Sequence, residues 1–441
     1  MPGLSFDLCL QALSSGAKHY VPRTRQRGAR QRRGNGPLMT SRLIPIVSLS
    51  LFASPLTLMA QNEEELELMK VYATRTSDSI HDTPASVTIL ERSDIDKFDS
   101  PGANLSTVLG KMLPGFGAPT ESVSSFGQTL RGRDVLILID GIPQIENRQI
   151  SRQLNNVKVE SIARVEVISG ANAIYGSGAP GGIINIITKS YSTEAASFET
   201  YLGTSFASKP LSYRSQTYNT QQTISGTLGS WKYLASIGAE ARNNRFDSSG
   251  KIIPPEPAQT SRSDTDSYDV LLKGLYQITP DSFVEANLQL FQEKQDTDYV
   301  AMLNPYRGEA GLELDEQPES KRKQIGLRYE SGSFFGQKLS VLAYHRNREL
   351  SFFPFYITVP APIVNQSRTF AEVTGAKAVV ETRLAESVEM AWGLDLERDK
   401  GKQRAHSYSQ LRYQISEGKI YNGKSADYDY GPVIQTDKAG L

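Results

Sequence analysis

A glycine-rich hinge between two short β-branched runs constrains the fold of this chain more than any other feature. The runs are Val165–Ile168 and Ile183–Thr188, and a third run, Val135–Ile139, ends at the turn-forming pair Asp140-Gly141. Runs of this length and composition are typical of buried strands. Five glycines lie between the first two runs: Gly170, Gly176, Gly178, Gly181 and Gly182. So many glycines indicate positive φ angles or close approaches of the backbone.

Part of the hinge matches a pattern that binds dinucleotides in other folds. Gly176–Gly181 reads G-x-G-x-x-G. That fingerprint requires a helix to open inside it, so that the helix N-terminus meets the pyrophosphate. Here Pro180 and the strand-forming run Ile183–Ile187 follow instead. The pattern therefore does not favour a nucleotide site.

Four blocks resemble, in order and spacing, the plug domain of TonB-dependent outer-membrane receptors. They are Arg131-Gly132, Leu136–Pro143, Ile162–Ile168 and Tyr175–Lys189. The resemblance covers Glu65 to Ser190 directly and the rest of the chain by strand pattern. It implies an N-terminal α/β plug domain with a mixed sheet, followed by an antiparallel transmembrane β-barrel around the plug.

After Ser190, apolar residues recur at every second position, as in strands with one apolar and one polar face. Nine candidate strands lie near 197–207, 220–229, 231–242, 266–278, 282–294, 321–330, 337–348, 368–384 and 388–400, and a tenth could follow Tyr428. Short connections alternate with long polar ones, which is typical of outer-membrane barrels and is not explained by a soluble sandwich. Because barrels of the family have about 22 strands, we expect the barrel to be incomplete in this chain, an N-terminal fragment.

Two leaders are expected before the plug. Residues 1–38 are basic, and we interpret them as non-native upstream sequence, although a nucleic-acid arm or a transit peptide has a similar composition. Residues 39–60 have a positive start, an apolar stretch and a small-residue cleavage site, as in a secretory signal peptide. We then expect a TonB box and flexible N-terminus at 61–80, the plug at 81–190 and the first part of the barrel at 191–441.

The zero net charge conceals an asymmetry. Residues 1–42 carry eight Lys or Arg against one Asp, a balance of +7, so the rest of the chain sums to −7. An acidic mature chain argues against nucleic acid as a partner. The single cysteine, Cys9, lies in the first leader. We therefore expect no disulfide and no thiolate metal site in the mature chain.

The segment Glu67–Arg75 resembles the TonB box and the residues that follow it. An extended segment with alternating apolar side chains can add as a strand to the sheet edge of a partner. A disordered tail is the alternative. The expected box residues are Glu67, Leu68, Met69, Lys70 and Val71. The resemblance thus implies TonB, with its inner-membrane energising complex, and outer-membrane lipid as partners.

The resemblance is strongest to receptors for ferric siderophores of the aerobactin-like hydroxamate group, and it implies a ferric siderophore as ligand. Cobalamin, copper chelates and saccharides are the alternative ligands. Two polar stretches, Phe116–Phe126 and Gln144–Asn156, correspond to plug loops that touch ligand in the family. The candidate ligand-binding residues are Phe126, Gln128, Glu146, Arg148 and Arg152. The two arginines suit an anionic chelate, whereas solvated loop charge is the alternative.

The resemblance also implies a latch between the plug and the barrel. Its residues here are Arg131, Arg164 and Glu166, and the carboxylate partners of the arginines are expected on barrel strands that this chain lacks. For Arg131, an ordinary charge on the plug surface is the alternative.

An enzyme is not expected from this sequence. The four histidines, His19, His81, His345 and His406, are scattered, and no H-E-x-x-H, G-x-S-x-G or P-loop pattern occurs. We predict no catalytic residue, no cofactor and no metal site. A passive adhesin or porin-like barrel is a further alternative, but it has no need for a plug or a TonB box.

Overall fold

The computed structural model describes the chain from position 86 onward, with gaps. The described ranges are 86–99, 101–118, 122–125, 127–145, 152–170, 180–207, 213–255, 262–303, 306–310, 314, 316–357, 363–385, 388–409, 414–416, 419–421, 428–429 and 434–440. All of them fall within one compact unit, Glu65–Leu441. Both expected leaders and the expected TonB box lie outside the described residues.

The plug domain contains a five-stranded mixed sheet, which confirms the expectation from the resemblance. Its strands are β1 (Ser86–Glu91), β2 (Val135–Ile139), β3 (Ile142–Pro143), β4 (Ile162–Ser169) and β5 (Gly182–Thr188). They pair in the order β1-β4-β5-β2-β3. β2 runs parallel to β5, and the other pairs are antiparallel. The three apolar runs of the sequence therefore lie side by side.

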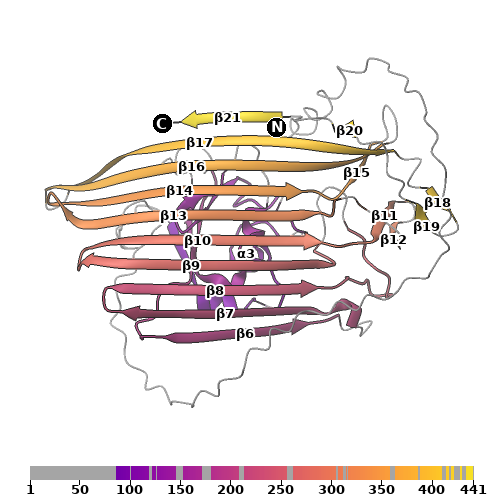
Figure 1. Cartoon of the computed structure of the whole chain (residues 1–441), viewed down its shortest axis with the longest axis horizontal. Coiled ribbons are helices and arrows are strands. Elements are labelled where there is room, and N and C mark those ends of the chain that lie inside the picture. Colours follow the sequence, from indigo (N-terminus) through magenta and orange to yellow (C-terminus); the bar gives the residue numbers. More distant parts are fainter. Residues whose placement is uncertain are drawn as a thin grey trace, which may run out of the picture. The chain divides into compact units, whose positions relative to one another are not determined.

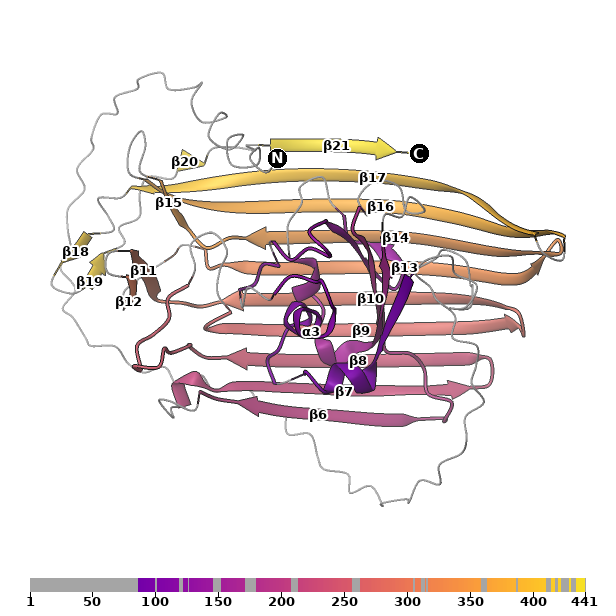
Figure 2. The same cartoon turned by 180° about the vertical axis from the view of Figure 1, so that it is seen from behind.

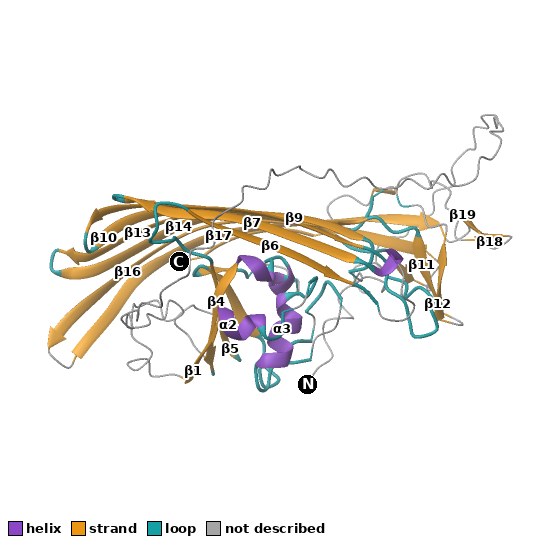
Figure 3. Cartoon of the chain, turned by 90° about the horizontal axis from the view of Figure 1, so that it is seen from below, coloured by secondary structure: helices purple, strands orange, loops and turns teal. Residues whose placement is uncertain are grey.

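Helices and turns complete the plug (Figure 3). They are α2 (Arg92–Asp96), α3 (Leu105–Met112), η3 (Gln153–Asn155) and η4 (Val159–Ser161). Asn104 caps the start of α3, because its side chain accepts a hydrogen bond of 2.8 Å from the backbone N–H of Thr107. Within the described ranges, no helix is both long and apolar enough to cross a membrane.

The plug buries both faces of its sheet. On one face, Leu105 and Leu109 of α3 are fully buried and belong to the same apolar cluster as Ile184 of β5. The smaller cluster on the other face contains Leu136, Leu138, Ile168 and Ile183. Burial on both faces explains why the apolar runs are continuous rather than alternating.

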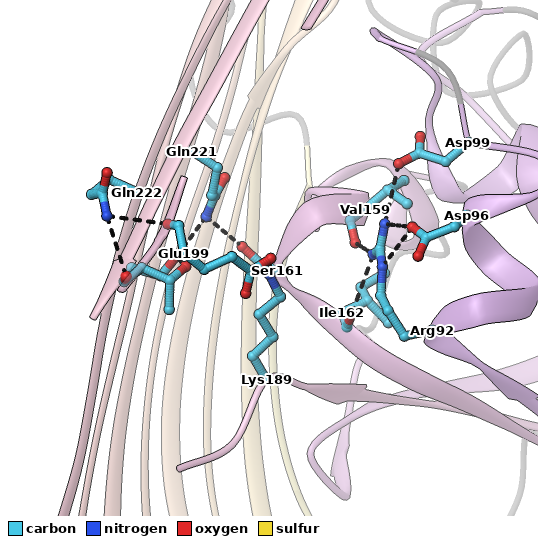
Figure 4. Close-up of polar contacts among 12 residues, drawn as sticks. Arg92, Asp96, Asp99, Val159, Ser161, Ile162, Lys189, Glu199, Gln221 and Gln222 are labelled. Carbon is cyan, nitrogen blue, oxygen red and sulfur yellow. Dashed lines mark hydrogen bonds and ion pairs between the residues drawn. The ribbon is translucent and has the colours of Figure 1, made fainter. Parts of the chain in front are cut away.

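Arg92 joins α2 to the start of β4 (Figure 4). Its guanidinium donates hydrogen bonds to the carbonyl oxygens of Val159, at 2.5 Å, and Ile162, at 3.3 Å. It also pairs with Asp96 at 2.5 Å and with Asp99 at 3.3 Å. A helix of five residues is unstable alone in water, so contacts of this kind hold α2 in place.

At two positions of the glycine-rich hinge, the structure shows why a side chain cannot be accommodated. Gly182 has a φ of +136°, and a Cβ atom there would lie 2.2 Å from the carbonyl oxygen of Ile168. A Cβ atom on Gly181 would lie 2.6 Å from the carbonyl oxygen of Arg133. Only glycine permits so close an approach of one backbone to another. These two glycines let β5 enter between β4 and β2.

The second sheet is antiparallel, and its strands follow the order of the chain (Figure 1). Its main strands are β6 (Ser197–Ser205), β7 (Thr217–Leu228), β8 (Trp231–Arg242), β9 (Thr265–Thr279), β10 (Ser282–Gln295), β13 (Glu319–Phe334), β14 (Gln337–Ser351), β16 (Ile363–Ala385) and β17 (Val388–Ser409). All nine strands expected from the alternating pattern are present. In addition, β20 (Tyr428–Asp429) and β21 (Ile434–Gly440) pair with β17.

The connections alternate in length as expected. Tight turns, such as Gly229-Ser230 and Phe335-Gly336, join strands at one end of the sheet. The long connections at the other end contain short elements: η5 (Tyr213–Ser215), β11 (Tyr299–Leu303), β12 (Tyr306–Ala310), β15 (Phe355–Ile357), β18 (Gln414–Ser416) and β19 (Lys419–Tyr421). This arrangement is that of outer-membrane barrels.

The two faces of the large sheet differ in chemistry. Along β9, Ser267, Asp269 and Lys273 are buried on the face that contacts the plug, which Figure 2 shows from the side of α3. On the opposite face, Tyr268 and Leu272 are 59% and 39% exposed. An apolar face for lipid and a polar face for the interior is the alternation that the sequence predicts.

Candidate functional site: the interface between plug and sheet

Polar side chains line the inner face of the large sheet, which we define as the face that contacts the plug. Its buried polar residues include Asn219, Gln221, Ser236, Glu240, Asp269, Lys273, Asn287, Gln289, Glu293, Arg322, Gln324, Arg346 and Arg348. Buried polar groups require hydrogen-bond partners. Several of these partners come from the plug, so the interface is held mainly by polar contacts.

Asp140, in the turn after β2, forms a buried ion pair with the sheet. Its carboxylate lies 3.5 Å from Nζ of Lys273 on β9 and accepts a hydrogen bond of 2.8 Å from Gln289 on β10. Thr188 of β5 donates to the same carboxylate from its backbone N–H at 2.9 Å and from its hydroxyl at 2.8 Å. Burial acts to raise the pKa of Asp140, but Lys273 and the Thr188 bonds together hold that pKa below its ordinary value. The plug thus presents a charged carboxylate to a lysine of the sheet.

A second ionic cluster joins the plug to β8. Lys158 lies 3.3 Å from Glu240, which also pairs with Arg242 at 2.8 Å and with Arg262 at 3.5 Å. Arg262 in turn lies 3.6 Å from Glu293 of β10. Each of these side chains is buried. The cluster therefore combines three cations with two carboxylates in a place that is largely removed from solvent.

Ser161 of η4 makes a third contact with the sheet. Gln221 of β7 donates a hydrogen bond of 2.9 Å to the hydroxyl of Ser161 (Figure 4). The same hydroxyl donates a hydrogen bond of 3.1 Å to Asp269 of β9. Beside it, Asn219 of β7 donates to the carboxylate of Glu160. Two neighbouring plug residues are thus bonded to two different strands.

Contacts continue toward the end of the sheet with the long connections. Gln144 donates a hydrogen bond of 2.9 Å to Gln324, and Ser320 donates one of 3.1 Å to Asn156. Arg346 of β14 donates to the carbonyl oxygen of Ile145. Both ends of the stretch Gln144–Asn156 are therefore fixed to the sheet.

Apolar packing accompanies these bonds at one place among the described residues. Ile142 of β3 is fully buried and packs with Leu342, Tyr344 and Val373 of the sheet. A hydrogen bond contributes only about 0.5–1.5 kcal/mol net, because water can replace either partner. The interface therefore fixes the position of the plug and still allows water to replace its contacts one at a time.

A basic cavity of about 350 Å³ lies between the plug and the long connections. It is lined by four cations, Lys111, Arg242, Arg245 and Arg262, and by no carboxylate among the described residues. Nη1 of Arg242 and Nε of Arg262 are buried without a hydrogen-bond partner in the described part of the chain. Guanidinium groups in such a setting suit anionic oxygens, which they bind through charge-assisted hydrogen bonds.

Arg152 marks a second basic region at the same end of the sheet. Its guanidinium lies over the ring of Phe352, 4.9 Å from the ring centroid, and the residue is 2% exposed. Burial lowers the pKa of Arg152 and nearby Arg348 lowers it further, whereas Glu293 raises it. Positive charge therefore gathers on the plug and on the inner face where the long connections begin.

Of the five expected ligand-binding residues, the structure describes Gln128 and Arg152. Phe126, Glu146 and Arg148 lie outside the described residues, as do the expected box residues Glu67, Leu68, Met69, Lys70 and Val71. Gln128 is buried, and its amide donates bonds of 3.1 Å to the carbonyl oxygens of Ser106 and Gly117. Gln128 thus joins two segments of the plug, whereas Arg152 reaches the sheet.

The expected latch residues bond within the plug. Arg164 pairs with Glu166 at 2.9 Å, and the fully buried Glu166 accepts a bond of 3.1 Å from Asn185. Arg131 is exposed and has a φ of 51°, and its backbone N–H donates to the carbonyl oxygen of Gly115 at 2.7 Å. A contact between these arginines and barrel carboxylates stays a prediction.

Sequence reasoning missed the residues of the sheet that hold the plug. The sequence alone predicts a turn at Asp140 and a strand that contains Lys273, without the contact between them. Lysine and glutamate are almost never fully buried without a partner. Charged residues on the polar face of a strand, such as Lys273 and Glu240, were therefore the signal that could have identified this interface.

Comparison with known families supports the description of the plug. A family model described as TonB-dependent Receptor Plug Domain matches residues 79–183. The rhizobactin receptor of Rhizobium meliloti (strain 1021) is 28% identical over 82% of this chain and 51% of that protein. The ferric aerobactin receptor of Klebsiella pneumoniae is 26% identical over 85% of this chain and 54% of that protein. The chain spans about half the length of these curated relatives.

Solved structures share the fold. The unliganded ferric citrate transporter FecA has a TM-score of 0.59 and 16% identity, covering 81% of this chain and 53% of that one. The copper transporter OprC has a TM-score of 0.55 and 14% identity, covering 78% and 50%. The mixed plug sheet and the long antiparallel sheet therefore correspond to about half of such a receptor.

We expect Lys273→Met to loosen the plug in the full-length protein. The substitution leaves the buried Asp140 carboxylate without its cation, and breaking a buried ion pair in this way costs about 3–5 kcal/mol. Limited proteolysis of the plug in outer-membrane preparations should become faster, and cells should become more sensitive to large antibiotics that the outer membrane normally excludes.

Lys189→Met is the matched control, because Lys189 pairs with Glu199, which is 60% exposed. Water can solvate the exposed carboxylate that is left, and such a pair contributes about 0–1 kcal/mol, so this variant should behave like the wild type. The double variant Asp140→Asn/Lys273→Met should recover part of the lost protection. Equal protease resistance in Lys273→Met and wild type would contradict the assignment.

Proposed function

Because the chain belongs to the TonB-dependent receptors, we propose that the whole protein imports a ferric siderophore. These receptors are outer-membrane proteins of Gram-negative bacteria and are not enzymes. In this proposal the siderophore binds outside the cell, and TonB with its inner-membrane energising complex drives import through the box Glu67–Val71. The alternatives are a receptor for cobalamin, a copper chelate or a saccharide, and a barrel that works without energy.

The observation that carries this proposal is the polar interface between plug and sheet. A passive barrel has no need for an internal domain that occupies its interior. An importer needs a plug that closes the barrel at rest and that a modest force can displace. Contacts such as Asp140–Lys273 and Ser161–Gln221 fit this need, because water can take the place of each partner as the plug moves.

Positive charge at the end of the sheet with the long connections supports an anionic ligand. Lys111 and Arg245 line a cavity beside the long connections, and Arg152 is a further, buried cation near them. A ferric chelate with carboxylate or hydroxamate oxygens can accept charge-assisted hydrogen bonds from such groups. A neutral saccharide gains less from them. The siderophore names of the two relatives agree with this choice.

We expect Met69→Pro to abolish uptake of iron-55-labelled ferric aerobactin in the full-length receptor while leaving its binding to cells unchanged. Proline removes a backbone donor and fixes φ, so the segment can no longer pair along the sheet edge of TonB. Uptake and binding are measured on the same cells, with and without a collapsed proton-motive force.

Ser77→Pro is the matched control, since it makes the same backbone change outside the box and should transport normally. Normal uptake by Met69→Pro would contradict the box, and uptake that ignores the proton-motive force would support the passive barrel instead. Failure to bind any ferric hydroxamate would point to one of the other ligands.

We expect the double variant Lys111→Gln/Arg245→Gln to bind ferric aerobactin at least about tenfold more weakly, because each charge-assisted hydrogen bond that is lost is worth about 1.5–3 kcal/mol. Lys97→Gln, an exposed charge on the plug away from the cavity, is the control and should leave the Kd unchanged. Equal affinity in the double variant and wild type would place the ligand elsewhere.

A further inference from the structure

The hairpin of β13 and β14 presents four arginines on the inner face of the large sheet. They are Arg322, Arg328, Arg346 and Arg348, and we call them the arginine track. Over positions 320–328 and 342–350, all of which the structure describes, the other inward residues are Ser320, Gln324, Gly326, Leu342, Tyr344 and Leu350. None of these is a carboxylate. One strip of the inner face therefore carries positive charge only.

The track follows the direction of the strands. Arg322 lies directly opposite Arg348, Arg346 is one inward position further along β14, and Arg328 lies opposite Leu342. The six residues from Arg322 to Arg328 span about 20 Å, at ~3.4 Å per residue. The apolar band of an outer-membrane barrel is about 25 Å tall. The track therefore covers most of the distance from the long connections to the tight turns.

The stability of the sheet does not explain this arrangement. Arg322, Arg346 and Arg348 are 6%, 3% and 6% exposed. Like charges directly opposite each other on neighbouring strands are destabilising, and the burial of charged groups adds a further cost. A cluster that is costly to the fold needs a cause other than the fold.

Contacts with the resting plug do not explain the charges either. Arg328 donates a hydrogen bond of 2.7 Å to the carbonyl oxygen of Asp140, and Arg346 donates one to the carbonyl oxygen of Ile145. Both acceptors are neutral. A side-chain amide can make the same kind of bond at a lower cost of burial, since only a charged donor loses ionic solvation.

The sheet contains such amide contacts beside the track. Gln144 of the plug and Gln324 of β13 share a hydrogen bond of 2.9 Å. Arg322, in turn, donates at 3.0 Å to the side-chain oxygen of Gln289, again a neutral acceptor. Arg328 also lies 3.6 Å from Glu330, at the end of the track near the tight turns. These resting contacts of Arg322, Arg328 and Arg346 thus require less charge than the track provides.

One plug segment, Asp140–Ile145, covers the track. Its two ends accept hydrogen bonds from Arg328 and Arg346, and Ile142 between them packs against Leu342 and Tyr344. Displacement of this segment therefore takes neutral acceptors away from two arginines at once and uncovers their guanidinium groups. Anionic oxygens form stronger, charge-assisted hydrogen bonds with such groups than carbonyl oxygens do.

The charge of the adjacent strands differs from that of the track. On one side, β9 and β10 mix Lys273 with the carboxylates of Asp269 and Glu285. On the other side, β17 presents three inward carboxylates, which are Asp395, Glu397 and Asp399. Because like charges repel, an anion inside the barrel is attracted to the β13–β14 strip and kept away from β17.

We propose that the arginine track is a transit site for the anionic ferric chelate after the plug segment Asp140–Ile145 has moved. The oxygens of the chelate bind Arg322, Arg346 and Arg348 first and Arg328 later. Successive inward positions are about 7 Å apart, so the chelate contacts the next cation before it leaves the last. Several moderate sites in series allow both entry and release. This inference rests on the proposed import of an anionic chelate.

The test uses full-length receptor in iron-starved cells. Arg322→Gln/Arg348→Gln removes two charges from the track and leaves Arg328 and Arg346 to bond the plug. Binding of iron-55-labelled ferric aerobactin is measured with a collapsed proton-motive force, and uptake is measured without it, per receptor in the outer membrane. We expect an unchanged Kd and a maximal uptake rate about tenfold lower, because charge-assisted hydrogen bonds are lost during passage only.

Two further variants separate charge from plug docking. Arg322→Lys/Arg348→Lys keeps both charges and should restore most of the uptake rate. Gln324→Ala removes a plug contact without a change of charge and should transport normally. Limited proteolysis should find the plug of the Arg322→Gln/Arg348→Gln variant as protected as that of the wild type.

The other outcomes count against the track. Normal uptake by Arg322→Gln/Arg348→Gln beside an active wild type would overturn the track and leave the proposed function intact. Equally slow uptake by the lysine variant or by Gln324→Ala, or a plug that loses its protection, would show that these residues act by shape or docking. A wild type that imports no ferric hydroxamate would overturn the proposed function, and the track with it.

Discussion

The structure depends on hydrogen bonds and ion pairs between two sheets of different character. The Asp140–Lys273 pair shows the principle: a plug carboxylate, charged because Lys273 and Thr188 outweigh the effect of burial on its pKa, faces a lysine of the large sheet. If this interface were apolar, the plug would be part of a continuous core and could not leave it cheaply. Because it is polar, water can take over its contacts.

The polar interface between plug and sheet determines where the apolar side chains of the plug and of the large sheet lie. The plug contains its own apolar core around α3, with Leu109 and Ile184 fully buried. Among the described residues, the inner face of the large sheet is mainly polar, although it includes the apolar group Leu342, Tyr344 and Val373 around Ile142, and apolar side chains such as Leu272 and Trp392 face outward. One chain thus carries a plug with its own apolar core and a large sheet whose polarity is the reverse of that of a soluble protein.

Local pattern and resemblance predicted the elements, but not their mutual contacts. The alternation of apolar residues after Ser190 predicts the strands, and the block from Tyr175 to Lys189 predicts the plug. The partners of Asp140 and Ser161 could not be predicted, because they depend on the register between strands far apart in the sequence. The amide of Gln128, an expected ligand-binding residue, donates to two plug carbonyls, a contact that sequence does not reveal because it does not show which way a loop side chain turns.

The most direct test of a plug that must separate from the sheet is a reversible cross-link across the interface. Ser161→Cys and Gln221→Cys, introduced together in the full-length receptor, put thiols at a contact whose native atoms are 2.9 Å apart. A short, reducible cross-linker should join them at rest, stop uptake of ferric siderophore and leave binding intact, and reduction should restore uptake. Normal uptake by the cross-linked receptor would contradict the account.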